Sequence, residues 1–134
     1  MENEELTERA ESVLNRYTDA RGRVHGDVGA AVLGANGTVY TGVCVDTPGW
    51  GLCAERSALA AMITDKEYKM KKMVAVWRDE KTSKLHVLPP CGICRQFMRD
   101  IDESNMDAEV ILGKKESEKL RDLIPHHGWP APLG

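Results

Sequence analysis

Two short segments hold the residues whose types and spacing suit metal chemistry. They are Cys53-Ala54-Glu55 and Pro90-Cys91-Gly92-Ile93-Cys94, and each is predicted to lie where a loop enters a helix. Cysteines three apart on a helix share one face, with Cβ atoms roughly 5–6 Å apart. A tetrahedral zinc ion with Zn–S bonds of about 2.3 Å needs sulfurs roughly 3.8 Å apart, which side chains leaning inward supply. The spacing therefore predicts a Zn²⁺ site.

The number of cysteines in these segments favours a catalytic site over a structural one. Three cysteine ligands leave a fourth position free for water, and an open position is typical of catalytic zinc. Glu55 lies two residues after Cys53 and so points in a different direction, better placed to address water and substrate than to bind metal. Helix N-termini also favour thiolates, by about 0.3–1 kcal/mol.

Two other interpretations of the cysteines stay open at this point. In one of them Cys44, the remaining cysteine of the chain, completes a structural site with four cysteine ligands. In the other, Cys91 and Cys94 form a thioredoxin-like redox pair. The first leaves Glu55 and Arg56 without a reason to be there, and the second leaves Cys53 unexplained. For Cys44 itself, we favour a small buried residue in a strand.

Composition limits the class of protein. The 134 residues, taken as one domain over 1–134, are 42% hydrophobic and 29% charged, with a net charge of −3. That balance argues against a nucleic-acid partner, and the lysine run at 66–72 is interpreted as a solvated face. No apolar stretch is long enough for a membrane partner. The acidic start and the cysteine usage favour a cytoplasmic protein.

Apolar periodicity and turn residues predict the elements that position the two segments. An amphipathic helix is expected over 3–20, because apolar residues recur there at helical spacing. Further helices are expected over 53–63, 91–101 and 117–123. Strands are expected over 27–33, 38–45, 72–77, 84–88 and 108–112, the first two joined by an Asn-Gly turn within 34–37. This alternation predicts an α/β sandwich with helices on the sheet faces.

The motifs resemble those of the cytidine deaminase family, in the branch with three cysteine ligands. The resembling stretches are Val28-Gly29-Ala30-Ala31, Thr41-Gly42-Val43, Cys53-Ala54-Glu55-Arg56 and Pro90-Cys91-Gly92-Ile93-Cys94-Arg95-Gln96. The likeness runs in order from about residue 6 to 124. It implies a three-layer α/β/α sandwich with a mixed central sheet of about five strands. It also implies hydrolysis of cytidine or deoxycytidine to the uracil nucleoside and ammonia, in a homotetramer.

The resemblance also implies a role for each matching residue. Cys53, Cys91 and Cys94 match the zinc ligands, and Glu55 matches the group that carries protons between water, ring N3 and the leaving amine. Arg56 matches an arginine that hydrogen-bonds the ligand thiolates and offsets their charge. The substrate contacts fall on Cys44, Asp46 and Ala54.

The substrate positions are where this sequence departs from the family pattern. The family's Asn-Val-Glu, which holds the ribose hydroxyls, is replaced by Cys44-Val45-Asp46, and its base-packing aromatic by Gly26. The loop over 42–53 and the tail over 120–125 are similar to those of blasticidin S deaminase, so a modified cytosine nucleoside is the alternative substrate. Trp50 and Trp129 are candidates to line the pocket, and His126 and His127 are interpreted as solvated. A non-catalytic zinc-stabilised binding module and a nucleic-acid editing deaminase are the competing functions.

Overall fold

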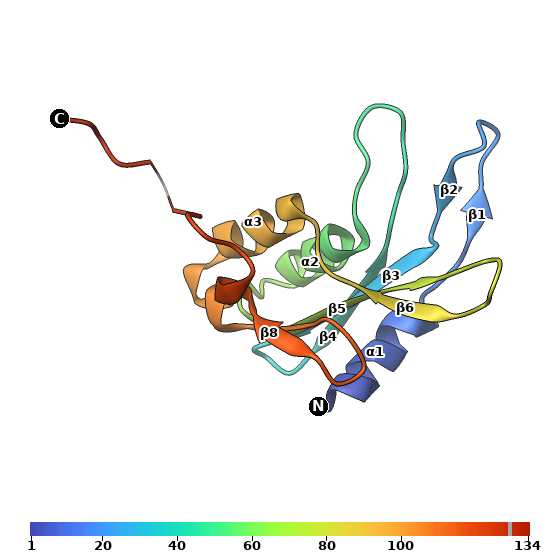
Figure 1. Cartoon of the computed structure of the whole chain (residues 1–134), viewed down its shortest axis with the longest axis horizontal. Coiled ribbons are helices and arrows are strands. Elements are labelled where there is room, and N and C mark those ends of the chain that lie inside the picture. Colours follow the sequence, from blue (N-terminus) through green and yellow to red (C-terminus); the bar gives the residue numbers. More distant parts are fainter. Residues whose placement is uncertain (129) are drawn as a thin grey trace.

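A mixed β-sheet with helices on both faces forms the centre of the computed structural model, which describes residues 1–128 and 130–134 (Figure 1). Its strands are β3 (Val28–Gly34), β4 (Val39–Val43), β5 (Met70–Arg78), β6 (Leu85–Leu88), β7 (Glu109–Ile111) and β8 (Ser117–Lys119). Their order is β4-β3-β5-β7-β8, with β6 also paired to β5. The β5–β7 pair is parallel and the other pairs are antiparallel. The α/β class and the mixed sheet are confirmed, with six strands among the described residues.

Both faces of the sheet are buried, because successive side chains of a strand point to opposite faces and both sets are apolar. On β3, Ala30 and Val32 belong to one cluster of buried residues, and Ala31 and Leu33 belong to the other. Helix α1 (Asn3–Ser12) packs on the second cluster through Leu6 and Ala10. This face of the sheet therefore has one covering helix.

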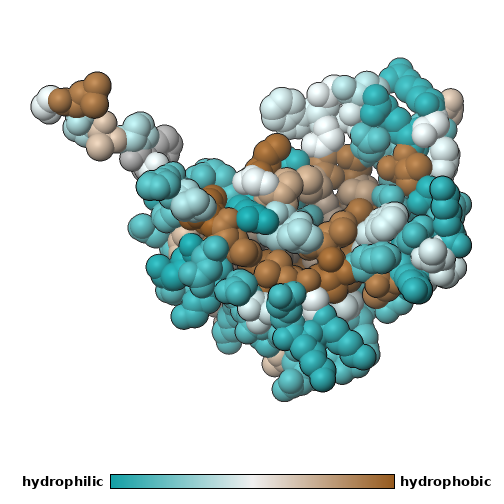
Figure 2. Space-filling view, in the orientation of Figure 1, coloured by the Kyte–Doolittle hydropathy of each residue, from teal (hydrophilic) through white to brown (hydrophobic). Residues whose placement is uncertain are grey.

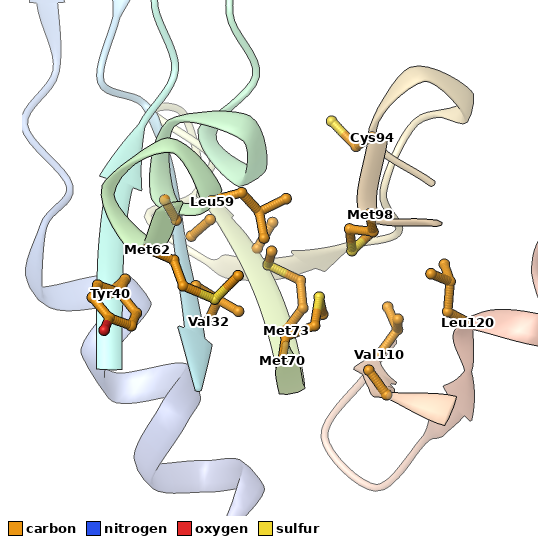
Figure 3. Close-up of a cluster of buried hydrophobic side chains, with 14 of the residues drawn as sticks. Val32, Tyr40, Leu59, Met62, Met70, Met73, Cys94, Met98, Val110 and Leu120 are labelled. Atoms are coloured by element: carbon orange, nitrogen blue, oxygen red, sulfur yellow. The ribbon is translucent and has the colours of Figure 1, made fainter. Parts of the chain in front are cut away.

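The opposite face carries α2 (Ala54–Thr64) and α3 (Gly92–Ile101). Leu59 and Met62 of α2 and Met98 of α3 pack there on Val32 and Met73 of the sheet (Figure 3). All these side chains are at most 1% exposed, so the two helices are fixed side by side on one rigid surface. Both helices begin at predicted metal-binding cysteines, and the core therefore sets the distance between the two motifs.

The first helix is shorter than predicted. It ends at Ser12, and residues 13–27 leave it for a small hairpin of β1 (Tyr17–Thr18) and β2 (Val24–His25). The helix expected over 3–20 is therefore wrong beyond residue 12. Tyr17 is 61% exposed and does not continue the apolar face. Gly22 and Gly26 take φ values of +81° and +70°, which a helix does not allow.

The end of the chain also differs from the prediction. Residues 117–119 form the edge strand β8 and Leu120–Asp122 one 3₁₀ turn, so the helix expected over 117–123 is wrong. The side chains of β8 are all exposed, and only backbone pairing with β7 defines the strand. A further 3₁₀ turn over Glu103–Asp107 was not predicted. Its buried Asn105 accepts from the Met70 N–H and donates to the carbonyls of Tyr68 and Met98.

The predicted hairpin between β3 and β4 is confirmed. The Gly34 N–H donates to the Thr38 carbonyl, and Gly37 has φ of +84°, as a turn containing Asn-Gly requires. The other strands and helices lie within two residues of their expected bounds. No helix among the described residues is both long and apolar enough to cross a membrane.

Close packing of β4 on α2 yields a test of the fold. A Cβ added at Gly42 would lie 2.5 Å from the Ala58 backbone nitrogen and 2.7 Å from the Ser57 carbonyl carbon. Gly42→Ala should push α2 off the sheet and lower the free energy of unfolding by about 1–3 kcal/mol, or Tm by about 5–15 °C. Calorimetry checks this against Gly49→Ala, whose Cβ meets nothing within 4 Å. Equal Tm values for the two variants contradict the packing argument.

Candidate metal centre

Three cysteine sulfurs come together where α2 and α3 begin. Cys53 and Cys91 are the N-cap residues of α2 and α3, and Cys94 lies in the first turn of α3. An isolated bridge between Val45 and Leu52 brings the chain back from β4, so that Cys53 follows directly. Cys94 lies one turn before Met98 on the buried side of α3 (Figure 3).

The distances among the sulfurs suit one small metal ion. Cys53 Sγ lies 3.7 Å from Cys91 Sγ, which lies 3.5 Å from Cys94 Sγ, and all three are within 4.8 Å of one another. Tetrahedral zinc with thiolate ligands needs separations of about 3.8 Å. Cys94 is buried, Cys53 is half-buried and Cys91 is exposed, so the cluster opens to solvent on the side of Cys91. The three-sulfur donor set therefore fits Zn²⁺ with one position open.

The electrostatics of the cluster also call for a cation. Burial and the nearby charge of Glu55 raise the pKa of the Cys94 thiol. Burial acts in the same direction on Cys91, but hydrogen bonds from Cys94 and Cys53 and from the Ile93 N–H lower its pKa overall. Three thiolates this close repel one another, and a bound Zn²⁺ deprotonates all of them.

Arg56 lies beside the sulfurs, as the resemblance implies. Its Nη2 is 3.6 Å from Cys53 Sγ, and this contact raises the pKa of the guanidinium. Its Nε is buried without a hydrogen-bond partner among the described residues. The side chain therefore supplies positive charge next to the thiolates.

Glu55 lies in the first turn of α2 with only 6% of its surface exposed. Burial raises the pKa of its carboxyl. It is outside the group of metal-binding atoms, and no side chain of the described residues hydrogen-bonds to it. Ala54, the residue between Cys53 and Glu55, is fully buried. A protonatable carboxyl group thus lies next to the cluster without binding to it.

Cys44 is separate from the metal cluster. Its thiol donates to Asp27 Oδ1 at 3.1 Å, and burial followed by this contact raises its pKa. Within the described residues the metal-binding group holds Cys53, Cys91 and Cys94 alone. A four-cysteine site completed by Cys44 is therefore not what the structure forms, and Cys44 is more polar in its contacts than a plain core residue.

Asp46 contacts the small hairpin, and Gly26 directly follows its second strand in the chain. Arg23 Nη1 is 3.1 Å from Asp46 Oδ1, and the Asp46 N–H donates to His25 Nδ1. Gly26 has a positive φ, and a Cβ there would be 2.1 Å from the Asn15 carbonyl oxygen. An aromatic residue is therefore sterically excluded at position 26.

None of the remaining candidates that the structure describes belongs to the group of sulfur ligands. Trp50 is 85% exposed at the tip of the loop over 46–51, and Trp129 lies outside the described residues. His127 is not free in solvent, because its Nδ1 accepts from Arg99 Nε at 3.0 Å on the outer side of α3. His126 is exposed. Sequence reasoning missed Arg23 and His25, because it placed residues 13–20 in a helix and saw no hairpin.

The geometry predicts which cysteines hold the metal. Cys53→Ser should reduce zinc affinity at least tenfold, whereas Cys44→Ser should leave it within about twofold, because only Cys53 belongs to the cluster. Metal analysis after dialysis against a graded chelator measures both, with circular dichroism to verify folding. Equal zinc loss in the two variants contradicts the three-cysteine assignment.

Comparison with known proteins also points to a zinc-binding domain. Residues 1–109 match the family described as the cytidine and deoxycytidylate deaminase zinc-binding region. The chain is 36% identical over 99 residues to a probable cytidine deaminase of Dictyostelium discoideum, covering 72% of this chain and 62% of that one. It is 34% identical over 104 residues to a cytidine deaminase of Halalkalibacterium halodurans, covering 73% and 74%.

Solved structures agree on the fold. The crystal structure of cytidine deaminase from Mycobacterium tuberculosis superposes with a TM-score of 0.74 at 26% identity, covering 94% of this chain and 96% of that one. The chain spans less than two thirds of the length of the first curated relatives that it matches. It covers 62% of the Dictyostelium protein and 34% of a cytidine deaminase from Vibrio vulnificus. With the family match over most of its length, a cytidine deaminase-like fold and a three-cysteine cluster that fits Zn²⁺, this chain belongs to the cytidine and deoxycytidylate deaminase family.

Proposed function

We propose that this protein hydrolyses the exocyclic amine of a cytosine nucleoside, converting cytidine or deoxycytidine to the uracil nucleoside and ammonia. One observation carries the proposal. At the N-termini of α2 and α3, three sulfurs are spaced for zinc, and the buried carboxyl group of Glu55 lies beside them. A purely structural zinc site has no use for an open position with a buried acid next to it. The relatives at 34–36% identity are called cytidine deaminases, which supports this chemistry.

The metal-binding residues in this proposal are Cys53, Cys91 and Cys94. A Zn²⁺ ion bound there would supply hydroxide near neutral pH, because it would lower the pKa of water to about 7. Three thiolates leave the centre with a net charge of −1, which weakens the cation as a Lewis acid. Arg56 offsets part of that charge through its contact with Cys53.

Glu55 moves the protons. In the proposed reaction the oxygen of water bonds to C4 of the ring, and the C4–N bond breaks to release ammonia. Glu55 takes one proton from the water and delivers it to ring N3. It then carries the second proton of that water, from the new hydroxyl group on C4, to the leaving amine. Its buried position favours this role, because burial raises the pKa of the carboxyl and lets it hold a proton between the two steps.

We assign the substrate contacts to Cys44 and Asp46, whereas Ala54, which the resemblance also implies, is fully buried and offers no surface to a substrate. Asp46 faces solvent with 55% of its side chain exposed and supplies a carboxylate for a sugar hydroxyl. Cys44 donates to Asp27, which leaves it a poor replacement for an amide. Since position 26 excludes an aromatic, the base is packed by other residues. This altered pocket keeps a modified nucleoside of the blasticidin type as the second candidate substrate.

Removing the proton carrier tests the chemistry. Glu55→Gln should lower kcat for cytidine at least a hundredfold while zinc content and Tm stay unchanged, because the amide accepts no proton. Ammonia release by the zinc-loaded protein is the measurement, with Glu8→Gln on the exposed side of α1 as the matched control. Full turnover by the Glu55→Gln variant sinks the proposal. A zinc-loaded protein inactive on cytidine but active on blasticidin S replaces the substrate with the second candidate.

We further propose that the protein works as a homotetramer in the cytoplasm. Apolar residues gather across the middle of one face (Figure 2), and Ile93, between two of the metal-binding cysteines, is 64% exposed. Exposed apolar surface is unfavourable in water, and contact with further copies of the chain removes it from water. The free thiols of all four cysteines suit a reducing compartment.

The mass of the zinc-loaded protein in solution tests the assembly. Light scattering should give four times the chain mass of 14.9 kDa, and Ile93→Asp should shift the protein toward smaller species, because the charge resists burial. Zinc content serves as the control for damage to the neighbouring ligands. A monomeric unaltered protein contradicts the homotetramer.

A further inference from the structure

The small β1–β2 hairpin holds the start of the loop that follows β4. His25 on β2 and Arg23, which directly precedes β2, both contact Asp46, the first charged residue after β4. Arg23 Nη1 lies 3.1 Å from Asp46 Oδ1, and the backbone N–H of Asp46 donates to His25 Nδ1 at 3.1 Å. The side chain and the backbone of one residue are therefore both fixed from the same hairpin.

The hairpin itself is held rigid by Asp19. Its Oδ1 accepts from the backbone N–H groups of Arg21 and Arg23, at 2.8 and 3.0 Å. Its Oδ2 lies 2.9 Å from His25 Nε2, and these contacts lower the pKa of the Asp19 carboxyl. Since His25 Nδ1 accepts from Asp46, Nε2 carries the proton and donates to Asp19. The ring of Tyr17 stacks on the same imidazole, with centroids 6.1 Å apart.

These contacts leave one oxygen of Asp46 available. Arg23 contacts Oδ1, whereas Oδ2 makes no hydrogen bond with any residue that the structure describes. A free surface carboxylate samples several rotamers, and a ligand that binds it must bear the cost of fixing it. The ion pair removes that cost in advance.

We propose that Arg23 and His25 are positioning residues for substrate binding, which orient Asp46 so that Oδ2 accepts a hydrogen bond from a sugar hydroxyl. This inference rests on the proposed function, which assigns Asp46 to the substrate. It also explains how an aspartate, one methylene shorter than the family's glutamate, reaches its partner in a defined direction. Arg23 acts through Asp46 and not on the reacting atoms.

The experiment compares two substrates in the zinc-loaded protein. Arg23→Gln should raise KM for cytidine about three- to tenfold, the effect of one misplaced hydrogen bond, with kcat within about twofold. It should leave kcat/KM for 2′,3′-dideoxycytidine unchanged, because that nucleoside has no 2′- or 3′-hydroxyl for Asp46 to bind. A general structural defect affects both substrates equally. An exposed ion pair adds little to stability, so the variant should fold normally.

Matched variants separate the loss of a positive charge on the hairpin from the loss of the orientation of Asp46. Arg21→Gln removes the same charge from the same hairpin at an exposed residue and should leave both substrates unaffected. His25→Phe keeps an aromatic ring against Tyr17 but removes both the acceptor for Asp46 and the donor to Asp19, and should repeat the Arg23→Gln pattern. His25→Asn restores an acceptor near Nδ1 and should recover much of the cytidine KM.

Each failure has its own signature. No turnover by the unaltered protein on either cytosine nucleoside overturns the proposed function and this inference with it. An unchanged cytidine KM in Asp46→Asn overturns the assignment of Asp46. A raised KM in Asp46→Asn, together with an unchanged KM in Arg23→Gln and His25→Phe, overturns the positioning role alone. Equal loss on cytidine and dideoxycytidine in Arg23→Gln also overturns it.

Discussion

Repulsion among three thiolates is the constraint on which the rest of this structure depends. Cys53, Cys91 and Cys94 place their sulfurs within 4.8 Å of one another, too close for three negative charges without a cation between them. The two helix N-termini contribute partial positive charges there, and Arg56 contributes one full positive charge through its contact with Cys53. A divalent ion supplies the remainder, so metal binding and local order around the helix starts are linked.

The packing of the sheet serves this constraint. Because α2 and α3 share one face of the sheet, a single core fixes the separation of their first turns. Gly42 lets the backbone of β4 approach α2 directly, which places Cys53 relative to the strand. At α3, Arg95 donates to the carbonyls of Pro90 and Leu123. It thereby joins the start of α3, which carries two of the cysteines, to the segment after the last 3₁₀ turn. Each ligand thus depends on packing that lies well outside its own motif.

Features that depend on residues close together in the chain could be predicted from the sequence. The spacing of Cys91 and Cys94 and the Asn-Gly turn within 34–37 are local signals, and both features are found. The β1–β2 hairpin and β8 were missed because backbone pairing defines these strands of two or three residues, which are too short to carry a periodic apolar pattern. The contacts of Asp46 were missed for the same reason, since Arg23 and His25 approach it from a segment expected to connect a helix to a strand.

The tight approach of Gly26 to Asn15 has a consequence for how this pocket evolves. A side chain at position 26 collides with the Asn15 carbonyl, and the backbone there has a positive φ, so no single substitution gives the base an aromatic partner at that point. A side chain at position 26 requires a differently shaped backbone between residues 15 and 26, which takes more than one substitution. The shape of the turn therefore keeps position 26 without a side chain, and a single point mutation does not change that. New substrates are more readily gained through the loop over 46–51, where side chains face open solvent.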